Sequence, residues 1–289
     1  HYISPMNRPA DEKDSETVTT HFDYHSINDR LVKLDILGHD DPTVIKMLEE
    51  LTNIPPQQIP VGDEKTMSIF RSTEAFGVTP EQIGSAVGTY GIPECGTQFV
   101  RQMIQDVQPK NFSQVVRVSG YSHGTDVWLN NAQDLIKSGK ATISTAICTR
   151  DDIMIYLIGK GVESGLAFTI MESVRKGKGL RDEWIQTMKD HDVPDWYIWS
   201  CKLIKYMFPK AHAAAYVMMA YRIAWYKVFH PLAYYAVFFS IRATSFSYEL
   251  MCMGKERLEY YMAEIRKKGD EASKKEQDTL KDMLSLIHI

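Results

Sequence analysis

The sequence comprises 289 residues, of which 44% are hydrophobic and 24% are charged, with a formal net charge of −4. A chain of this length can bury a hydrophobic core as one large domain or two, and its average charge gives no cationic signature for nucleic acid. No stretch reaches the ~18 consecutive apolar residues of a membrane span, so no membrane association is predicted. The four cysteines form no C-x-x-C pair, which predicts free thiols in a reducing, cytoplasmic compartment.

The first predicted element is a strand that ends at Gly38. Apolar residues at positions 32, 34 and 36 alternate with Lys33 and Asp35, and this period of two predicts a strand with one buried face. Two roles suit Asp35 in this pattern. It is either a solvated carboxylate paired with Lys33, or a carboxylate that a rigid strand turns toward a bound cation. The residues alone favour the structural role.

From Asp41 onward the pattern is helical. Asp41 is a candidate N-cap and Pro42 a candidate first helical residue, and Pro55 and Pro56 end that helix. Loops with breaker residues are expected at 91–93, 119–124 and 176–179, and a charged, solvated helix over 255–281 breaks at Gly269. This pattern predicts a mainly α chain, with an irregular multi-helix domain attached to a strand-bearing remnant. The further helices are expected at 63–72, 79–86, 96–107, 111–118, 128–138, 149–160, 163–176, 180–191, 193–207, 211–229, 231–242 and 247–267.

The charge is distributed unevenly, because no aspartate or glutamate occurs between Trp196 and Tyr248. Cations interleaved with aromatic rings suit a surface that meets phosphates and stacks bases. The alternative is a pair of core helices whose basic residues reach solvent through their long stems. The stretch contains Lys202, Lys205, Lys210, Arg222, Lys227 and Arg242, with aromatic residues that include Tyr206, Phe208, Tyr216, Tyr221, Trp225 and Tyr226.

Two short motifs contain glycines that allow a ligand to approach the backbone. Arg175–Gly179 reads RKGKG and fits neither the P-loop nor the dinucleotide fingerprint, so a helix C-cap with solvated lysines explains it equally well. Ser119–Asp126 reads SGYSHGTD, and its Thr125 or Asp126 is a candidate cap for a helix that starts near Trp128. The free N–H groups of such a helix could serve a phosphate, but a capped loop without a ligand is equally compatible.

Several stretches, taken together and in order, resemble the PolC branch of the C-family bacterial replicative DNA polymerases. The resemblance runs from about residue 4 to about residue 283, nearly the whole chain. The stretches are TTHFDYHSI (19–27), LDILGHDDPT (34–43), GIPE (91–94), SHGTDVW (122–128), RDDIM (150–154), MESVRKGKG (171–179) and YMFPKAHAAAY (206–216).

The resemblance implies a nucleotidyltransferase-type palm, in which three aspartates hold two Mg²⁺ ions. Asp35 matches the third of them and is the implied catalytic and metal-binding residue, whereas nothing in residues 1–35 matches the Asp-x-Asp of the other two. The implied division is the C-terminal part of the palm at 1–41 and the fingers at 42–283. Residues 284–289 follow a charged helix abruptly and are expected to be a non-native tail.

The same resemblance implies that the fingers close over the incoming dNTP. Arg150 and Lys210 would meet the triphosphate, with Lys176 and Lys178 as further phosphate candidates. The residues implied near the base and sugar, or in the same motif, are Ser119, Ser122, His123, Tyr206, Phe208 and His212.

We therefore expect the parent protein to be a DNA-directed DNA polymerase that acts on primer–template DNA and dNTPs. By resemblance, it would contact a sliding clamp and other replisome subunits through parts outside this sequence. Because two implied carboxylates are missing, the isolated chain is expected to be inactive in primer extension. The alternatives are a non-catalytic helical nucleic-acid-binding module and a helical interaction domain whose basic and aromatic stretch is core.

Overall fold

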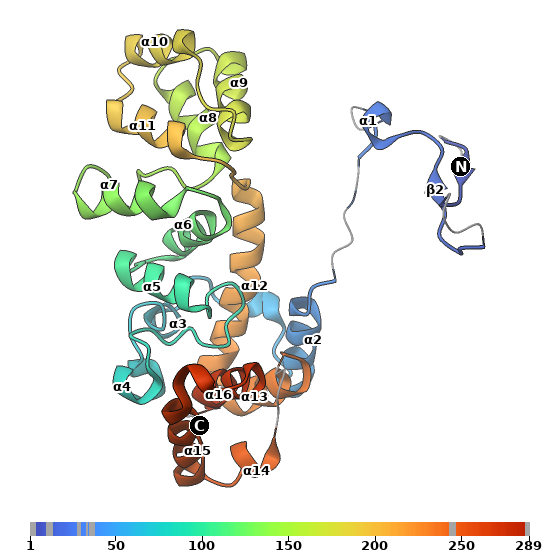
Figure 1. The fold of residues 1–289 in the computed structure, drawn as a ribbon, viewed down its shortest axis with the longest axis vertical. Helices are drawn as coiled ribbons and strands as arrows, with labels where there is room; N and C mark the ends of the chain where they lie inside the picture. Colours follow the sequence, from blue (N-terminus) through green and yellow to red (C-terminus); the bar gives the residue numbers. More distant parts are fainter. Residues whose placement is uncertain are drawn as a thin grey trace. The chain divides into compact units, whose positions relative to one another are not determined.

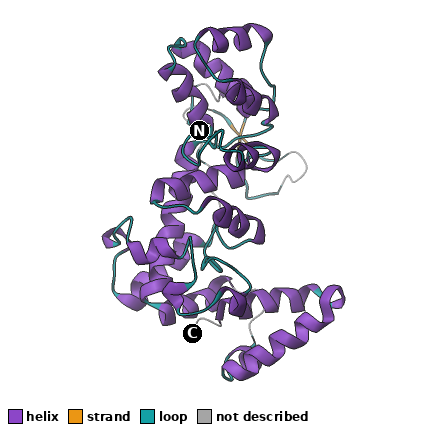
Figure 2. Ribbon diagram, turned by 90° about the vertical axis from the view of Figure 1, so that its left-hand side faces the viewer, coloured by secondary structure: helices purple, strands orange, loops and turns teal. Residues whose placement is uncertain are grey.

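The computed structural model describes residues 4–9, 14–27, 30–32, 34, 38–242 and 247–286. The chain divides into two compact units, His1–His39 and Asp40–Ile289. Helices account for almost all regular structure in the second unit (Figure 2). The prediction of a mainly α chain with a small strand-bearing part is therefore confirmed. None of the described helices combines the length and the apolar character needed to cross a membrane.

The first unit contains a two-stranded antiparallel sheet, in which β1 (Met6–Asn7) pairs with β2 (Thr19–Thr20), followed by the short helix α1 (Tyr24–Ile27). The strand predicted before Gly38 is wrong at its two described apolar residues. Val32 is 87% exposed and Leu34 80% exposed, and neither belongs to a strand. A buried strand face needs hydrogen-bonded neighbours and a core, and no described residue of this unit pairs with either residue. Asp35 lies outside the described residues.

The second unit is built from helices that pack side by side along α12, the long orange helix of Figure 1. α12 contacts α2, α3, α6, α8 and α13. The α-helices are α2 (Asp41–Thr52), α3 (Glu64–Ser68), α4 (Pro80–Ile83), α5 (Gln98–Val107), α6 (Phe112–His123), α7 (Gln133–Lys137), α8 (Arg150–Gly159), α9 (Ser164–Arg175), α10 (Asp182–Asp190), α11 (Asp195–Leu203), α12 (Lys210–Phe229), α13 (Pro231–Val237), α14 (Tyr248–Met251), α15 (Lys255–Lys268) and α16 (Lys274–Leu286). Short 3₁₀ or π turns occur at Pro56–Gln58, Glu74–Phe76, Trp128–Ala132, Phe238–Arg242 and Gly269–Glu271.

α12 is central because residues 220–228, in its second half, are all buried or half-buried, which is typical of a helix enclosed by others. Tyr221 and Tyr226 are fully buried, and their hydroxyls bond to the backbone of neighbouring loops. Lys227 is also fully buried. For this part of the acid-free stretch the core interpretation is therefore correct, whereas Lys202, Lys205 and Lys210 before it are exposed.

The loop predicted at 119–124 is wrong, because α6 continues through His123. Gly120 is needed there for close packing between segments. A Cβ at this position would lie 2.8 Å from the carbonyl oxygen of Cys148, which crosses the helix. Glycine and serine in a row favour a turn, which is why the sequence predicts a loop here. Gly120 is instead required by a contact with a residue that is distant in sequence. The turn from Trp128 also lacks a side-chain cap, so neither Thr125 nor Asp126 has the predicted capping role.

Two helix boundaries differ from the prediction for local reasons. Asp41 lies inside α2, and its carboxylate pairs with Arg242 instead of capping the helix. The helix expected over 247–267 is interrupted before α15, where Gly254 has a φ of +99°. The predicted break at Gly269 is confirmed. α15 and α16 pack together and bury an apolar face against Ile83 of α4.

Candidate functional site

The segment 206–210, between α11 and α12, joins three motifs that are far apart in sequence. The N–H of Thr125 donates to the carbonyl of Tyr206 at 2.9 Å, and the N–H of Met207 donates to Arg175 at 3.2 Å. The N–H of Arg150 donates to the carbonyl of Phe208 at 3.1 Å. These bonds tie the segment to the region after α6, the end of α9 and the start of α8. The side chains of all three regions are thereby fixed around one short backbone.

Close backbone packing on this segment requires glycine at position 177. Gly177 has a φ of +69°, and a Cβ there would lie 2.5 Å from the carbonyl oxygen of Lys205. The two lysines of the RKGKG motif therefore lie on either side of a residue that packs tightly against the segment before α12. The motif has a structural role in addition to any role in ligand binding.

A substitution at Gly177 tests this packing. Gly177→Ala is expected to destabilise the chain by about 2–3 kcal/mol, because it adds a backbone clash to the cost of a left-handed conformation. Gly179→Ala is the matched control, since Gly179 has a φ of +75° but no atom within 4 Å of the added Cβ. The control is expected to cost about 1 kcal/mol in urea unfolding. Equal losses for the two variants would contradict the proposed contact.

Aromatic and imidazole rings gather beside this backbone. Phe208 stacks on His212 with ring centroids 4.8 Å apart, and His212 contacts Tyr216 at 4.5 Å. Tyr206 and His123 each meet the edge or face of Phe208, at 5.1 Å and 5.7 Å. Tyr206 is 43% exposed, so its ring is available to stack on a planar ligand.

The partners of His123 favour its charged form. Its Nδ1 lies 2.7 Å from the carbonyl oxygen of Ser119, and its Nε2 lies 2.9 Å from a carboxylate oxygen of Glu94. Both of these oxygens are acceptors, and only the imidazolium can donate from both ring nitrogens at once. The hydrogen bond with Glu94 raises the pKa of His123 above its usual value. Ser122 also contacts Nδ1, at 3.1 Å.

A second cationic group forms around Glu172 on α9. Its carboxylate pairs with Arg175 and, at 3.0 Å, with Lys176, and Arg150 approaches it at 3.7 Å. The hydrogen bond from Arg175 is the main reason that the pKa of Glu172 falls to about 2. Three cations share one carboxylate, so this edge of the site keeps an excess of positive charge. The side chain of Arg150 is 33% exposed and can reach a ligand.

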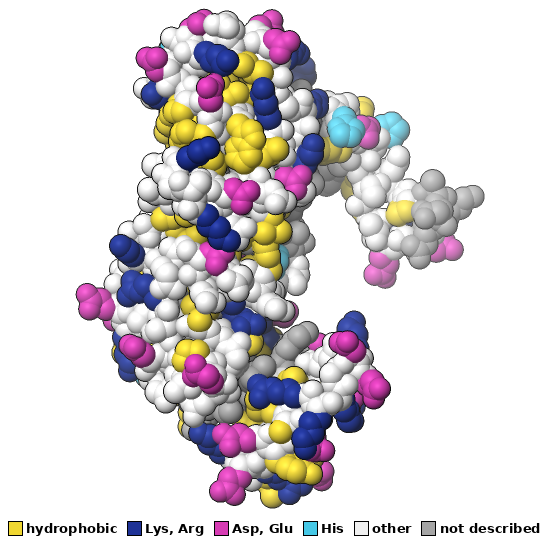
Figure 3. All heavy atoms as spheres, turned by 60° about the vertical axis from the view of Figure 1, so that its left-hand side comes forward, with side chains coloured by type: hydrophobic (Ala, Val, Ile, Leu, Met, Phe, Trp, Pro, Cys, Tyr) yellow, Lys and Arg dark blue, Asp and Glu magenta, His cyan; other side chains and the backbone are white. Residues whose placement is uncertain are grey.

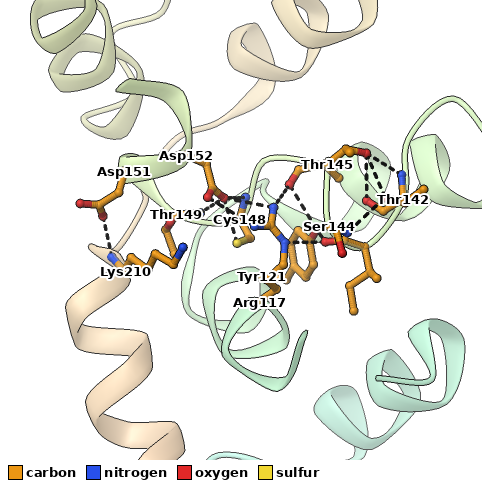
Figure 4. A network of polar contacts seen from close by, with 12 residues as sticks. Arg117, Tyr121, Thr142, Ser144, Thr145, Cys148, Thr149, Asp151, Asp152 and Lys210 are labelled. Atoms are coloured by element: carbon orange, nitrogen blue, oxygen red, sulfur yellow. Dashed lines mark hydrogen bonds and ion pairs between the residues drawn. The ribbon is translucent and has the colours of Figure 1, made fainter. Parts of the chain in front are cut away.

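The starts of α8 and α12 are fastened together. The carboxylate of Asp151 accepts the N–H of Lys210 at 2.6 Å and so caps α12, whose own N-cap residue, Pro209, makes no side-chain bond (Figure 4). Asp152, the next residue, accepts from Arg117 at 3.2 Å and from the N–H groups of Cys148 and Thr149 (Figure 4). These contacts fix the first turn of α8, and with it the position of Arg150.

The structure brings most of the predicted site residues together. Within the part of the chain that is described, no side-chain contact joins Lys178 to the group. Ser119 is buried, and its carbonyl oxygen bonds to Nδ1 of His123, so it holds the imidazole in place and is not itself exposed to a ligand. Asp35 lies outside the described residues. The residues gathered around segment 206–210 are Ser119, Ser122, His123, Arg150, Lys176, Tyr206, Phe208, Lys210 and His212.

Three acidic residues that organise the site were not predicted as site residues. Glu172 precedes Arg175 and Lys176 by three and four residues on a helix, a spacing that predicts ion pairs. Asp151 lies in the first turn of α8, where negative charge is favourable, but its carboxylate caps a different helix, α12. Glu94 is 29 positions from His123, and no local pattern in the sequence indicates their contact.

The face drawn in Figure 3 carries no broad basic patch, because its Lys and Arg side chains are interspersed with acidic ones and with hydrophobic ones. At the site itself, the cationic groups are particular side chains, such as Arg150 and Lys176. Phosphate groups suit guanidinium, ammonium and imidazolium donors, and the exposed ring of Tyr206 suits a base. The arrangement can bind a ligand that carries both.

Comparison with known proteins agrees with this geometry. Residues 41–192 match the family model of the bacterial DNA polymerase III alpha subunit finger domain. The chain is 57% identical over 278 residues to the PolC-type DNA polymerase III of Caldanaerobacter subterraneus, and 58% identical over 278 residues to those of Oceanobacillus iheyensis and Bacillus subtilis. Each match covers 96% of this chain but only 19–20% of the relative, so the chain spans about a fifth of their length. The chain therefore belongs to the PolC-type DNA polymerase III family, with residues 41–192 in its finger domain.

Proposed function

We propose that the chain supplies the nucleotide-binding fingers of a DNA-directed DNA polymerase. The observation that carries the proposal is the segment 206–210, whose backbone bonds join it to Arg150, to Arg175 beside Lys176, and to Thr125, two residues after His123. Arg150 and Lys210 would hold the triphosphate of an incoming dNTP, and Tyr206 would stack on its base or sugar. The membership of the family supports this assignment.

Electrostatics would make the site selective for a polyphosphate. The ring of His123 meets the ring of Phe208, and the backbone N–H of Arg150 bonds to the carbonyl of Phe208, so both cationic side chains start from residues fixed beside Phe208. A triphosphate would replace Glu172 as the partner of the exposed part of Arg150. Because the carboxylate of Glu172 stays ionised and paired with Arg175, the cationic edge would keep its shape when the ligand leaves.

The family implies magnesium, and the described residues do not fit such a site by themselves. Among them, no group of three His, Cys, Asp or Glu side chains is arranged to hold a metal ion. Asp35, the one carboxylate that the sequence assigns to magnesium, lies outside the described residues. The proposed nucleotide binding therefore rests on side chains of this chain without a metal ion, and Asp35 as a metal ligand stays a prediction.

We further propose that the whole polymerase extends a primer on a DNA template. The primer hydroxyl would attack the α-phosphate of the dNTP held by the fingers, and pyrophosphate would leave. Primer–template DNA would be bound jointly with parts outside this sequence, as would a sliding clamp and other replisome subunits. The expected location is the cytoplasm, because the substrates are chromosomal DNA and dNTPs.

Arg150→Ala in the full-length polymerase that contains this segment tests the proposal. The KM for dNTP is expected to rise about 10–100-fold, because a charge-assisted bond to phosphate contributes about 1.5–3 kcal/mol. Steady-state primer extension over a range of dNTP concentrations measures the change. Arg181→Ala is the matched control, since Arg181 is exposed and pairs with Glu183 away from segment 206–210.

Two results would contradict the assignment. An unchanged KM in Arg150→Ala would remove Arg150 from the nucleotide site. Binding of primer–template by the wild-type protein without any dependence on dNTP would favour a non-catalytic nucleic-acid-binding module. The two results are distinguishable, because only the second also lacks primer extension by the wild type.

A further inference from the structure

A fully buried lysine lies at the end of α12. The Nζ of Lys227 donates to the carbonyl oxygen of Tyr90 at 2.7 Å and to that of Gly88 at 3.3 Å. The rings of Phe76 and Tyr234 face it, with centroids 4.8 Å and 5.7 Å from Nζ. Among the described residues no carboxylate pairs with it, and burial lowers its pKa to about 7.

Packing alone does not explain a lysine at this position. Removing an ammonium group from water is costly, and a methionine would fill a similar volume without that cost. The amine instead satisfies two buried carbonyl groups that belong to one turn. Its contribution is therefore to fix the backbone between Gly88 and Tyr90.

That turn begins a short segment whose two ends are tied together. The hydroxyl of Thr89 donates to the carbonyl of Cys95 at 2.8 Å. A Cβ on Gly91 would lie 2.4 Å from the hydroxyl oxygen of Tyr234, and one on Gly96 would lie 3.2 Å from the nitrogen of Gly91. With so little space on either side, residues 88–96 are expected to shift as one body.

Glu94 lies within this segment in an unfavourable backbone conformation. Its φ is +63°, which a residue with a side chain adopts only when its surroundings enforce it. The carboxylate reaches Nε2 of His123 at 2.9 Å. The position of Glu94 therefore depends on what holds the turn at Gly88 and Tyr90.

We propose that Lys227 is a positioning residue of the nucleotide site, which holds the turn at Gly88 and Tyr90 and thereby keeps Glu94 against His123. Lys227 does not itself reach the site, because it is fully buried and its partners are backbone carbonyls. The inference rests on the proposed binding of dNTP. It adds a residue on the core side of α12 to those that determine the charge and orientation of His123.

The test is a double-mutant cycle between Lys227→Met and Glu94→Gln in the full-length polymerase bound to primer–template. Each single variant is expected to weaken dNTP binding by about tenfold, as expected for loss of one charge-assisted contact. The double variant is expected to be no weaker than the weaker single variant, because both changes act through the same contact. The dissociation constant for dNTP is the measured quantity.

The pH dependence of dNTP binding provides a second readout that a merely structural role would not change. Affinity should fall as the pH rises through the pKa of His123, because the imidazolium is the form that attracts phosphate. Glu94 and His212 are titratable groups that face His123. Since Glu94 raises the pKa of His123, the midpoint of the profile should move to lower pH in both single variants.

Lys189→Met is the matched control, because Lys189 is exposed on α10 and is expected to give wild-type binding and pH profile. If Lys227→Met does not fold, Lys227→Gln takes its place, and a smaller loss of affinity with the same pattern in the cycle is expected, since its amide can keep part of the hydrogen bonding to the carbonyls. Multiplicative losses in the cycle, or an unmoved pH midpoint, would overturn the inference. Absence of dNTP binding by the wild type would instead overturn the proposed function.

Discussion

Asp35→Asn is expected to lower the kcat of primer extension by at least about 1,000-fold in the full-length polymerase. An amide has the shape of the carboxylate but not its charge, and charge neutralisation by a metal contributes several kcal/mol to phosphoryl transfer. The KM for dNTP should change little, because Arg150 and Lys210, and not Asp35, are the proposed partners of the triphosphate. Single-turnover extension at several Mg²⁺ concentrations measures the effect.

The alternative role of Asp35, an exposed or ion-paired carboxylate beside Lys33, predicts a different result. In that case the substitution would change kcat by less than about threefold, as is usual for surface charges. Asp40→Asn is the matched control, because Asp40 is exposed and makes no capping bond with its side chain. A kcat in Asp35→Asn close to that of this control would remove Asp35 from the catalytic residues.

The helices of this chain were predictable where a local pattern determines them. α12 follows Pro209 and is rich in apolar residues. The predicted helix, 211–229, therefore agrees with the observed one, Lys210–Phe229, to within one residue. The boundaries of α6 were not predictable, because Gly120 is determined by the backbone of Cys148. The local pattern of residues around Gly120 does not show that the backbone of Cys148 packs against α6.

The site residues divide in a similar way into those that the sequence could indicate and those that depend on tertiary contacts. Family resemblance selected Arg150, Lys210 and His123, and the structure gathers them around segment 206–210. Two of the acidic residues that position them, Glu94 and Asp151, were missed because their contacts are tertiary. Glu94 meets His123 only once the segment 88–96 is folded against α12. The cap that Asp151 provides could not be predicted either, since nothing in the sequence shows that α12 begins beside it.

Asp152→Asn is expected to lower the free energy of unfolding of the chain by about 3 kcal/mol. The carboxylate accepts from Arg117 at 3.2 Å and from the N–H groups of Cys148 and Thr149 at 3.0 and 3.2 Å (Figure 4). Arg117 is only 12% exposed, so removing its ionic partner leaves a largely buried charge. Urea unfolding, followed by the fluorescence of buried Trp128, measures the loss.

Asp151→Asn is a control on the adjacent residue, and it separates the two roles at the start of α8. Asp151 makes one bond, to the N–H of Lys210, so its substitution should cost about 1 kcal/mol. Asp152 also fixes the loop that leads to Arg150, so Asp152→Asn should raise the KM for dNTP in the full-length polymerase as well. Equal stability losses in the two variants would contradict a special role for the Arg117–Asp152 pair. A normal KM in Asp152→Asn would show that the bond to Phe208 and the contact with Glu172 suffice to hold Arg150 in place.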